Sequence, residues 1–289
     1  MRQQSLRRRT SPSLTVVMWL MLVYTLLPLL FLIISATKDE DSLLTTFGLS
    51  FGHGFSLFTN IKDVFTVQNG IYLRWFENTV LYAVVGAGGA SIIATAGGYA
   101  LAKYRFQGRR LMFAIVLGAI SVPGTALAVP TYLLFAKFDL VNTIWAVIIP
   151  ALSSPFGLYL MLVYTLGAVP DELLEAARID GAGEFRTFRT ISMRLLAPGF
   201  VTVLLFAVVA TWNNYFLPLI VLNTPKLYPL TVGIAQWNQD ATGFNGDASA
   251  SFYPLVITGS LLAIIPLIAC FLFLQRFWQS GLAAGSVKQ

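Results

Sequence analysis

Residues 169–185 read VPDELLEAARIDGAGEF. Pro170, followed by two acids, is a typical helix start, because proline suits the first turn and carboxylates stabilise the positive end of the helix dipole. Asp180-Gly181 is typical of a helix stop and a turn. From Glu184 a second segment follows, in which apolar residues recur at spacings of three or four. The stretch therefore predicts two short helices joined at a glycine.

The chain around this stretch is strongly apolar. Of its 289 residues, 56% are apolar and only 11% are charged, against about 25% charged in an ordinary soluble domain. Six apolar runs contain no Asp, Glu, Lys, Arg or His, and each exceeds the roughly 20 residues that cross a bilayer. The runs are residues 14–36, 79–102, 111–136, 143–166, 199–222 and 252–275. We therefore expect an all-α, polytopic membrane protein with six transmembrane helices. A disordered chain, a disulfide scaffold and an ordinary soluble enzyme are excluded.

The charged residues all lie outside the six runs and predict how the chain crosses the membrane. Fourteen of the 19 cations fall in the two tails and in the loops after the second and fourth runs. If all six runs span, these segments share one side, and the positive-inside rule places that side, with both termini, in the cytoplasm. The net charge of +6 thus indicates topology and a lipid partner, not a nucleic acid.

One membrane domain, residues 14–275, accounts for most of the chain. Cytoplasmic tails are expected at 1–13 and 276–289, and an inner loop at 169–197. The first run has the basic flank and small residues of a secretory signal peptide. Its length exceeds the roughly 7–15 apolar residues of such a peptide, which favours a retained span.

The chain offers little for catalysis. It holds one histidine, His53, between two glycines, and one cysteine, Cys270. A single cysteine excludes an internal disulfide, and one cysteine with one histidine excludes a Cys/His metal cluster. The chain also has no phosphate-cradling G-x-x-x-x-G-K-[ST] string. We expect no catalytic residue, no metal and no cofactor bound by this chain. A solvated loop is the simpler interpretation of His53 than a catalytic triad.

The helix pair itself allows two interpretations. Ala176-Ala177 leave one helix face almost bare of side chain, which lets another protein approach closely. An amphipathic hairpin that touches only lipid at the membrane surface fits the same residues. The residue pattern does not decide between these interpretations.

Several motifs of the chain form a recognisable set. In the loop they are Glu175-Ala176-Ala177, Asp180-Gly181-Ala182, Phe188 and Ile191. Outside the loop they are Phe76-x-Asn78-Thr79, Tyr99-Ala100-Leu101-Ala102-Lys103-x-x-Phe106-x-Gly108-Arg109, Val129-Pro130-x-Tyr132, Leu140-x-Asn142-Thr143, Ile149-Pro150, Trp212-Asn213-x-Tyr215-x-x-Pro218-Leu219, Gln275-Arg276, Gly281-Leu282 and Gly285-Ser286-Val287-Lys288. With these motifs the helix pair resembles the EAA loop of ABC-importer permeases, and the chain from about residue 14 to 289 resembles the MalG-like permeases of the carbohydrate uptake family. Arg194 stands where the family usually has a proline, which predicts a straighter second helix.

The resemblance implies a type I ABC importer permease fold, with a cytoplasmic coupling helix-turn-helix between transmembrane helices four and five. It implies a heterodimer with a MalF-like second permease, two ATPase subunits that bind ATP and Mg, and an extracytoplasmic substrate-binding protein. The setting would be the plasma (inner) membrane of a bacterium or archaeon, and the mechanism alternating access. This chain would be a non-catalytic subunit.

The implied substrate is a sugar, an oligosaccharide or a disaccharide. A polyol or a glycerophosphodiester is the alternative within the same machinery. An ATP-independent carrier or channel is an alternative of another class, although it would not need a docking helix pair. An integral-membrane enzyme fits poorly, because the ionisable residues lie in loops.

The resemblance also assigns roles to individual residues. Contact with the ATPase is expected from Glu175, Ala176, Ala177, Asp180, Gly181 and Ala182. Glu175 would meet a basic group of the ATPase, or else pair with Arg178 of its own helix. The tail residues Gly285, Ser286, Val287 and Lys288 would reach the ATPase, or else form a frayed end.

Polar and aromatic residues far along the apolar runs are candidates for the substrate path. They are Tyr132, Trp212, Asn213, Asn214 and Tyr215. Amides bond sugar hydroxyls, and aromatic rings stack on the apolar face of a sugar. Interhelical hydrogen bonds and an aromatic belt at the membrane boundary explain the same residues without a substrate.

Overall fold

The computed structural model describes residues 11–243, 249 and 251–285, and in these residues the regular elements are all helical. The described chain divides into two compact units. Unit 1 contains the chain up to Val64 together with Trp237–Leu261, and unit 2 contains Phe65–Gln236 together with the chain from Leu262 onward. The bounds of the membrane domain, 14–275, stay a prediction.

Unit 1 begins with two helices and the loop that follows them. Their bounds are α1 (Pro12–Ala36) and α2 (Glu40–Thr45). The loop is fastened to the end of α1 by a buried lysine: Lys38 Nζ donates to the Thr46 hydroxyl at 3.0 Å and to the Phe47 carbonyl at 2.9 Å. Asn60 adds two bonds from its amide to the Ala36 and Lys38 carbonyls. These polar contacts fix the loop against the end of α1.

Three further helices contribute residues to both units. They are α3 (Leu57–Tyr82), which is interrupted at 67–70, α13 (Leu230–Thr242) and α14 (Phe252–Gly285). The remaining elements of unit 2 are the π turn η1 (Ala83–Ala87), α4 (Gly88–Lys103), α5 (Arg109–Ser121), the 3-10 turn η2 (Gly124–Leu127), α6 (Ala128–Lys137), α7 (Trp145–Ala151), α8 (Pro155–Ala168), α9 (Asp171–Ile179), α10 (Glu184–Thr187), the π turn η3 (Phe188–Ser192), α11 (Met193–Trp212), α12 (Phe216–Val221) and the 3-10 turn η4 (Pro225–Leu227).

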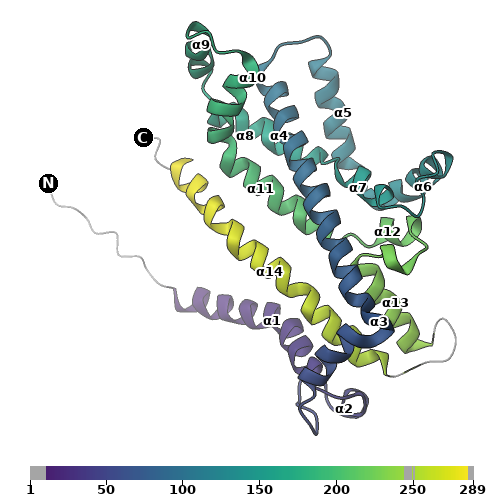
Figure 1. Ribbon diagram of the computed structural model, residues 1–289. Coiled ribbons are helices and arrows are strands. Elements are labelled where there is room, and N and C mark those ends of the chain that lie inside the picture. The colour runs from purple at the N-terminus through teal and green to yellow at the C-terminus, as the bar shows by residue number, and fades with distance from the viewer. Residues whose placement is uncertain (1–10, 244–248, 250, 286–289) are drawn as a thin grey trace, which may run out of the picture. The chain divides into compact units, whose positions relative to one another are not determined.

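The core of unit 2 is formed by α4, α8 and α11, which pack against one another (Figure 1). Close approach of α4 and α8 depends on Gly98. A Cβ atom there would lie 2.7 Å from the Leu162 backbone nitrogen and 2.7 Å from Met161 Cβ. A glycine is needed at such a contact because any side chain would push the two helices apart.

Five helical stretches are long and apolar enough to cross a membrane, judged by length and composition alone. They are Pro12–Ala36, Ile71–Lys103, Trp145–Ala168, Glu184–Trp212 and Phe252–Gln275. A sixth span results only if Arg109–Ser121 and Gly124–Lys137 are counted together, and these two are bent by 99°. The run predicted at 111–136 is thus broken, because Pro123 holds Val122 in an extended conformation and lacks an N–H.

The fifth predicted run, 199–222, overlaps only in part with the helical stretch observed there. The helix starts at Glu184, passes through a π turn and ends at Trp212. Arg194 lies in α11, and the straighter second helix expected from the missing proline stays a prediction. The second run, predicted to start at residue 79, starts at Ile71.

Candidate functional site

The glycine elbow after α9 has the hydrogen bonds of a Schellman motif. The Ala182 N–H donates to the Ala177 carbonyl at 2.9 Å, and the Gly181 N–H donates to the Arg178 carbonyl at 3.0 Å. Gly181 has a φ of +77°, in the left-handed region that favours glycine. Asp180 closes the helix, as expected from the sequence.

One face of α9 is covered by the chain itself. Leu174 belongs to a buried cluster with Tyr99 of α4, Met161 of α8 and Leu196 of α11. Ala177 is also buried, with 5% of its surface exposed. The face of α9 that carries these residues is therefore anchored on the three core helices.

The opposite face of α9 is open. Glu175 and Ala176 are exposed, and Leu173 and Ile179 expose 43% and 86% of their surface. The expectation that both alanines leave a bare docking face needs correction, because Ala177 lies on the covered side. Successive helix residues are about 100° apart, so adjacent alanines cannot both face outward fully.

Polar contacts fasten the two short helices to the end of α4. Lys103 Nζ lies 2.6 Å from Asp171 Oδ1. Glu184, the first residue of α10, accepts from the Tyr104 hydroxyl and from Arg178 Nε, both at 2.8 Å. We call these five side chains the α4 clasp. The clasp joins the end of α4, both ends of α9 and the start of α10.

The α4 clasp shifts the titration of its members. The hydrogen bond from Lys103 lowers the pKa of Asp171. The hydrogen bonds from Arg178 and Tyr104 lower the pKa of Glu184. Burial, followed by the bond to Glu184, raises the pKa of the Tyr104 hydroxyl. Each shift favours the protonation state in which the clasp is closed.

Sequence reasoning did not select the clasp as a site. It considered an i,i+3 pair between Glu175 and Arg178, but Arg178 pairs with Glu184, and Glu175 makes no ion pair within the described chain. A signal was nevertheless present, because Lys103 belongs to one of the motifs that carry the resemblance. Glu175 therefore keeps its carboxylate free on the open face.

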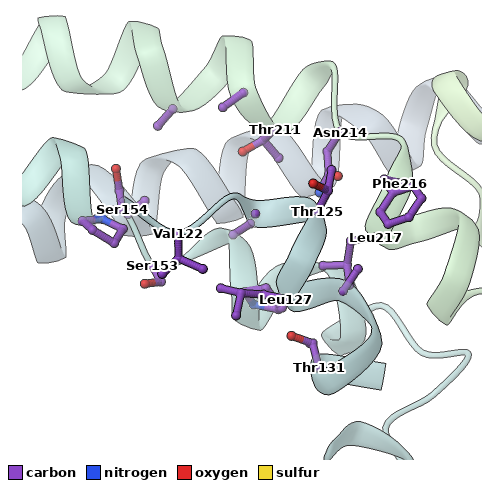
Figure 2. A pocket seen from close by; sticks show the side chains of 18 of the residues that line it. Val122, Thr125, Leu127, Thr131, Ser153, Ser154, Thr211, Asn214, Phe216 and Leu217 are labelled. Atoms are coloured by element: carbon purple, nitrogen blue, oxygen red, sulfur yellow. The ribbon is translucent and has the colours of Figure 1, made fainter. Parts of the chain in front are cut away.

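A cavity of about 860 Å³ lies in unit 2, beside the bend between α5 and α6 (Figure 2). Its polar lining residues are Thr125, Thr131, Ser153, Ser154, Thr211 and Asn214, and its other lining residues are apolar or small. No charged side chain lines it. The cavity thus presents hydroxyls and one amide to a neutral polar molecule.

Of the five predicted path residues, Asn214 lines this cavity (Figure 2). Trp212 is buried elsewhere, and its indole N–H donates to the Ala263 carbonyl of α14 at 3.1 Å. The amide of Asn213 donates to the Val209 carbonyl of its own helix at 2.9 Å. The end of α11 therefore directs neighbouring side chains to different surroundings.

Tyr132 and Tyr215 are half-buried and are not among the residues that line the cavity. Tyr132 instead packs on a cluster that includes Tyr82 and Phe135. The residue before it, Thr131, does reach the cavity. The sequence analysis did not select Thr131 or the other hydroxyl-bearing residues that line the cavity.

Two further expectations concern the tail and metals. Gly285 is the last described residue of α14, and Ser286, Val287 and Lys288 lie outside the described residues. In the part of the chain that is described, no group of three or more His, Cys, Asp or Glu side chains could hold a metal ion.

The chain is similar to known proteins over nearly its whole length. Residues 3–283 match a family described as "Binding-protein-dependent transport system inner membrane component". The chain is 32% identical to the arabinooligosaccharides transport system permease protein AraQ of Halalkalibacterium halodurans, covering 98% of this chain and 100% of that protein. It is 30% identical to the maltodextrin transport system permease protein MdxG of Bacillus subtilis, covering 93% of each.

A solved structure has the same fold. It is the crystal structure of a bacterial ABC transporter involved in the import of the acidic polysaccharide alginate, and one of its chains aligns with a TM-score of 0.78 at 20% identity. The alignment covers 93% of this chain and 99% of that chain.

Proposed function

Because the chain belongs to the family of binding-protein-dependent transport system inner membrane components, we propose that it is the permease subunit of an ATP-driven sugar importer. It is a multi-pass membrane protein of this family. The proposed complex contains a MalF-like second permease, two ATPase subunits that bind ATP and Mg, and a substrate-binding protein outside. In this complex the chain itself is non-catalytic.

The observation that carries the proposal is the two-sided construction of α9. One face is anchored on α4, α8 and α11, while Glu175 and Ala176 lie on a face that nothing in the described chain covers. An ATPase that docks on the open face and moves would therefore move the core helices as a body. This arrangement favours protein docking over a hairpin that touches only lipid.

The orientation follows from the same assignment. An ATPase works in the cytoplasm, so α9 and both termini lie on that side, in agreement with the excess of cations in the tails and inner loops. The tail from Gly285 to Lys288 is proposed to reach the ATPase as well. Glu175 supplies a carboxylate for a basic group of the ATPase.

The cavity lining supports a neutral, hydroxyl-rich substrate. It has six polar side chains and no charge, which suits an oligosaccharide or disaccharide. A glycerophosphodiester would need a cation there, which would have to come from the second permease. Relatives are named for arabinooligosaccharides, maltodextrin and melibiose, raffinose and stachyose.

The test uses the complete importer in liposomes, with uptake of labelled sugar measured against ATP hydrolysis. Ala176→Glu places a charge and bulk on the open face of α9 and should abolish co-purification of the ATPase and uptake. Gln107→Glu, an exposed residue in another inner loop, is the matched control and should preserve both. Sugar uptake by the chain alone without ATP, or normal uptake by Ala176→Glu, would contradict the proposal.

A further inference from the structure

A second, smaller cavity of about 320 Å³ lies between α4, α5 and α8. Three of its five lining residues are apolar: Leu101, Phe113 and Leu162. The other two are Arg109 and Arg110. Leu101 and Leu162 are buried, with 2% and 8% of their surface exposed, so they form a hydrocarbon floor. The cavity therefore joins an apolar wall to two guanidinium groups.

The two arginines have no anion of their own. No acidic side chain lines the cavity, and within the described residues neither arginine takes part in an ion pair or a side-chain hydrogen bond. Lys103, at the other end of the same loop, differs because it pairs with Asp171. Arg109 is half-buried, and a charge partly withdrawn from water is stabilised by a partner of opposite charge.

The cavity lies where α4 ends and α5 begins. Arg109 is the first residue of α5, and Leu101 lies two residues before the last residue of α4. This is the level at which a charge-free apolar run gives way to a basic loop, and therefore the level of lipid headgroups. Guanidinium groups bind phosphate oxygens through paired hydrogen bonds, and basic pockets between membrane helices suit anionic headgroups.

We propose that this cavity binds an anionic phospholipid, with the headgroup phosphate on Arg109 and Arg110 and an acyl chain against Phe113, Leu101 and Leu162. The apolar wall distinguishes a lipid from free phosphate, which would leave those three side chains unused. The assignment of the site to the cytoplasmic leaflet rests on the proposed function. The lipid chemistry of the site does not.

Such a lipid would fill a gap beside a weakly packed helix. No residue of α5 is buried. Its ring contact with α8 joins Phe113 to Tyr159, with the centroids 6.4 Å apart. A lipid seated on Arg109 and Phe113 would contact α5 on one side and the buried leucines of α4 and α8 on the other. The bound lipid is therefore expected to stabilise α5 against α8.

The experiment measures retention of phosphatidylglycerol by the complete importer. The complex is placed in nanodiscs of phosphatidylcholine in which about one lipid in four is phosphatidylglycerol. It is then released into mild detergent, and native mass spectrometry counts the anionic lipid that stays bound. The double variant Arg109→Gln, Arg110→Gln should retain about tenfold less phosphatidylglycerol than the unaltered protein, because each cation near the surface contributes to anionic lipid binding.

The matched control is Arg105→Gln, which removes an exposed cation of the same loop that does not line the cavity. This variant should retain the lipid fully. An equal loss of phosphatidylglycerol in Arg105→Gln would show that diffuse surface charge holds the lipid, and it would overturn the proposed site. Undiminished retention in the double variant would overturn it as well.

Two further arms separate lipid from free phosphate and from a protein partner. Excess inorganic phosphate should not displace the lipid, and displacement would reassign the cavity to a small anion. Phe113→Ser keeps both arginines and should still weaken lipid retention. Unchanged lipid retention in this variant would indicate a site for an acidic protein surface instead.

Subunit composition and thermal unfolding of each variant control for misfolding. An importer that retains the lipid but takes up no sugar would count against the proposed function and leave the lipid site standing.

Discussion

The ammonium group of Lys103, the last residue of α4, lies 2.6 Å from the carboxylate of Asp171, the first residue of α9. The Lys103 side chain is only 6% exposed, whereas that of Asp171 is 76% exposed. The contact joins two segments that are 68 residues apart in the sequence. It gives α9 a connection to α4 that is independent of its peptide connections to α8 and α10.

This contact predicts that a charge exchange preserves coupling better than either single change. Asp171→Lys places two cations together and should lower the sugar transported per ATP hydrolysed several-fold, because α9 loses this ion pair with α4 and is repelled from Lys103 instead. Lys103→Asp should do the same, and the double exchange should restore much of the ratio. The ratio of uptake to ATP hydrolysis in liposomes measures this. No recovery in the double exchange would mean that the pair only shapes the loop.

The α4 clasp is expected to stay closed across the physiological pH range. The folded-state pKa values of Asp171 and Glu184 are lowered, so the stability they contribute is fully present above their unfolded values, near about 4. It is lost as the pH falls through the lower folded-state values. The pKa of Tyr104 is raised, so its hydroxyl keeps its proton below about pH 10.

The measurement compares the melting temperature of the unaltered protein with that of Glu184→Gln in detergent. The difference should be constant from about pH 6 to 9 and should shrink only below about pH 4. Glu172→Gln, an exposed residue of α9 outside the clasp, controls for the general loss of an acid. A difference that changes near neutral pH would show that another group controls the clasp.

The left-handed backbone at the elbow predicts an asymmetry between two nearby glycines. Gly181 has a φ of +77°, so Gly181→Ala should cost about 1 kcal/mol of stability and loosen the turn after α9. Gly183 has a φ of −70°, and a Cβ atom there meets nothing within 4 Å. Gly183→Ala should therefore be close to neutral. Thermal unfolding and co-purification of the ATPase measure both variants, and equal effects would contradict the role of the turn.

Local signals predicted much of the coupling segment. Pro170, Asp180 and Gly181 act through backbone preferences that depend on a few neighbouring residues, so the helix start and the elbow follow from the sequence. Which of Ala176 and Ala177 is exposed depends on where α4 and α8 lie, and residue spacing alone does not give that. The clasp depends in the same way on contacts between distant segments.

In the membrane helices, too, local features follow from the sequence and features set by distant contacts do not. Apolar length identified the helical runs, whereas the 99° bend depends on how the chain resumes after Pro123. Where α11 ends, Trp212 is its last residue and bonds to α14, whereas Asn214 lies beyond the helix and lines the large cavity. Polarity and depth alone treat these residues as equivalent.

The last prediction uses that separation at the end of α11. If the large cavity receives the sugar, Asn214→Leu removes its one amide and should raise the KM for uptake about tenfold or more, because a buried hydroxyl of the substrate is left unpaired. Asn213→Leu removes an identical amide that bonds to its own helix and does not line the cavity. It should leave the KM unchanged. Uptake kinetics in liposomes with saturating binding protein measure both variants. An equal effect of the two changes, or an effect of Asn213→Leu alone, would place the sugar path outside this cavity.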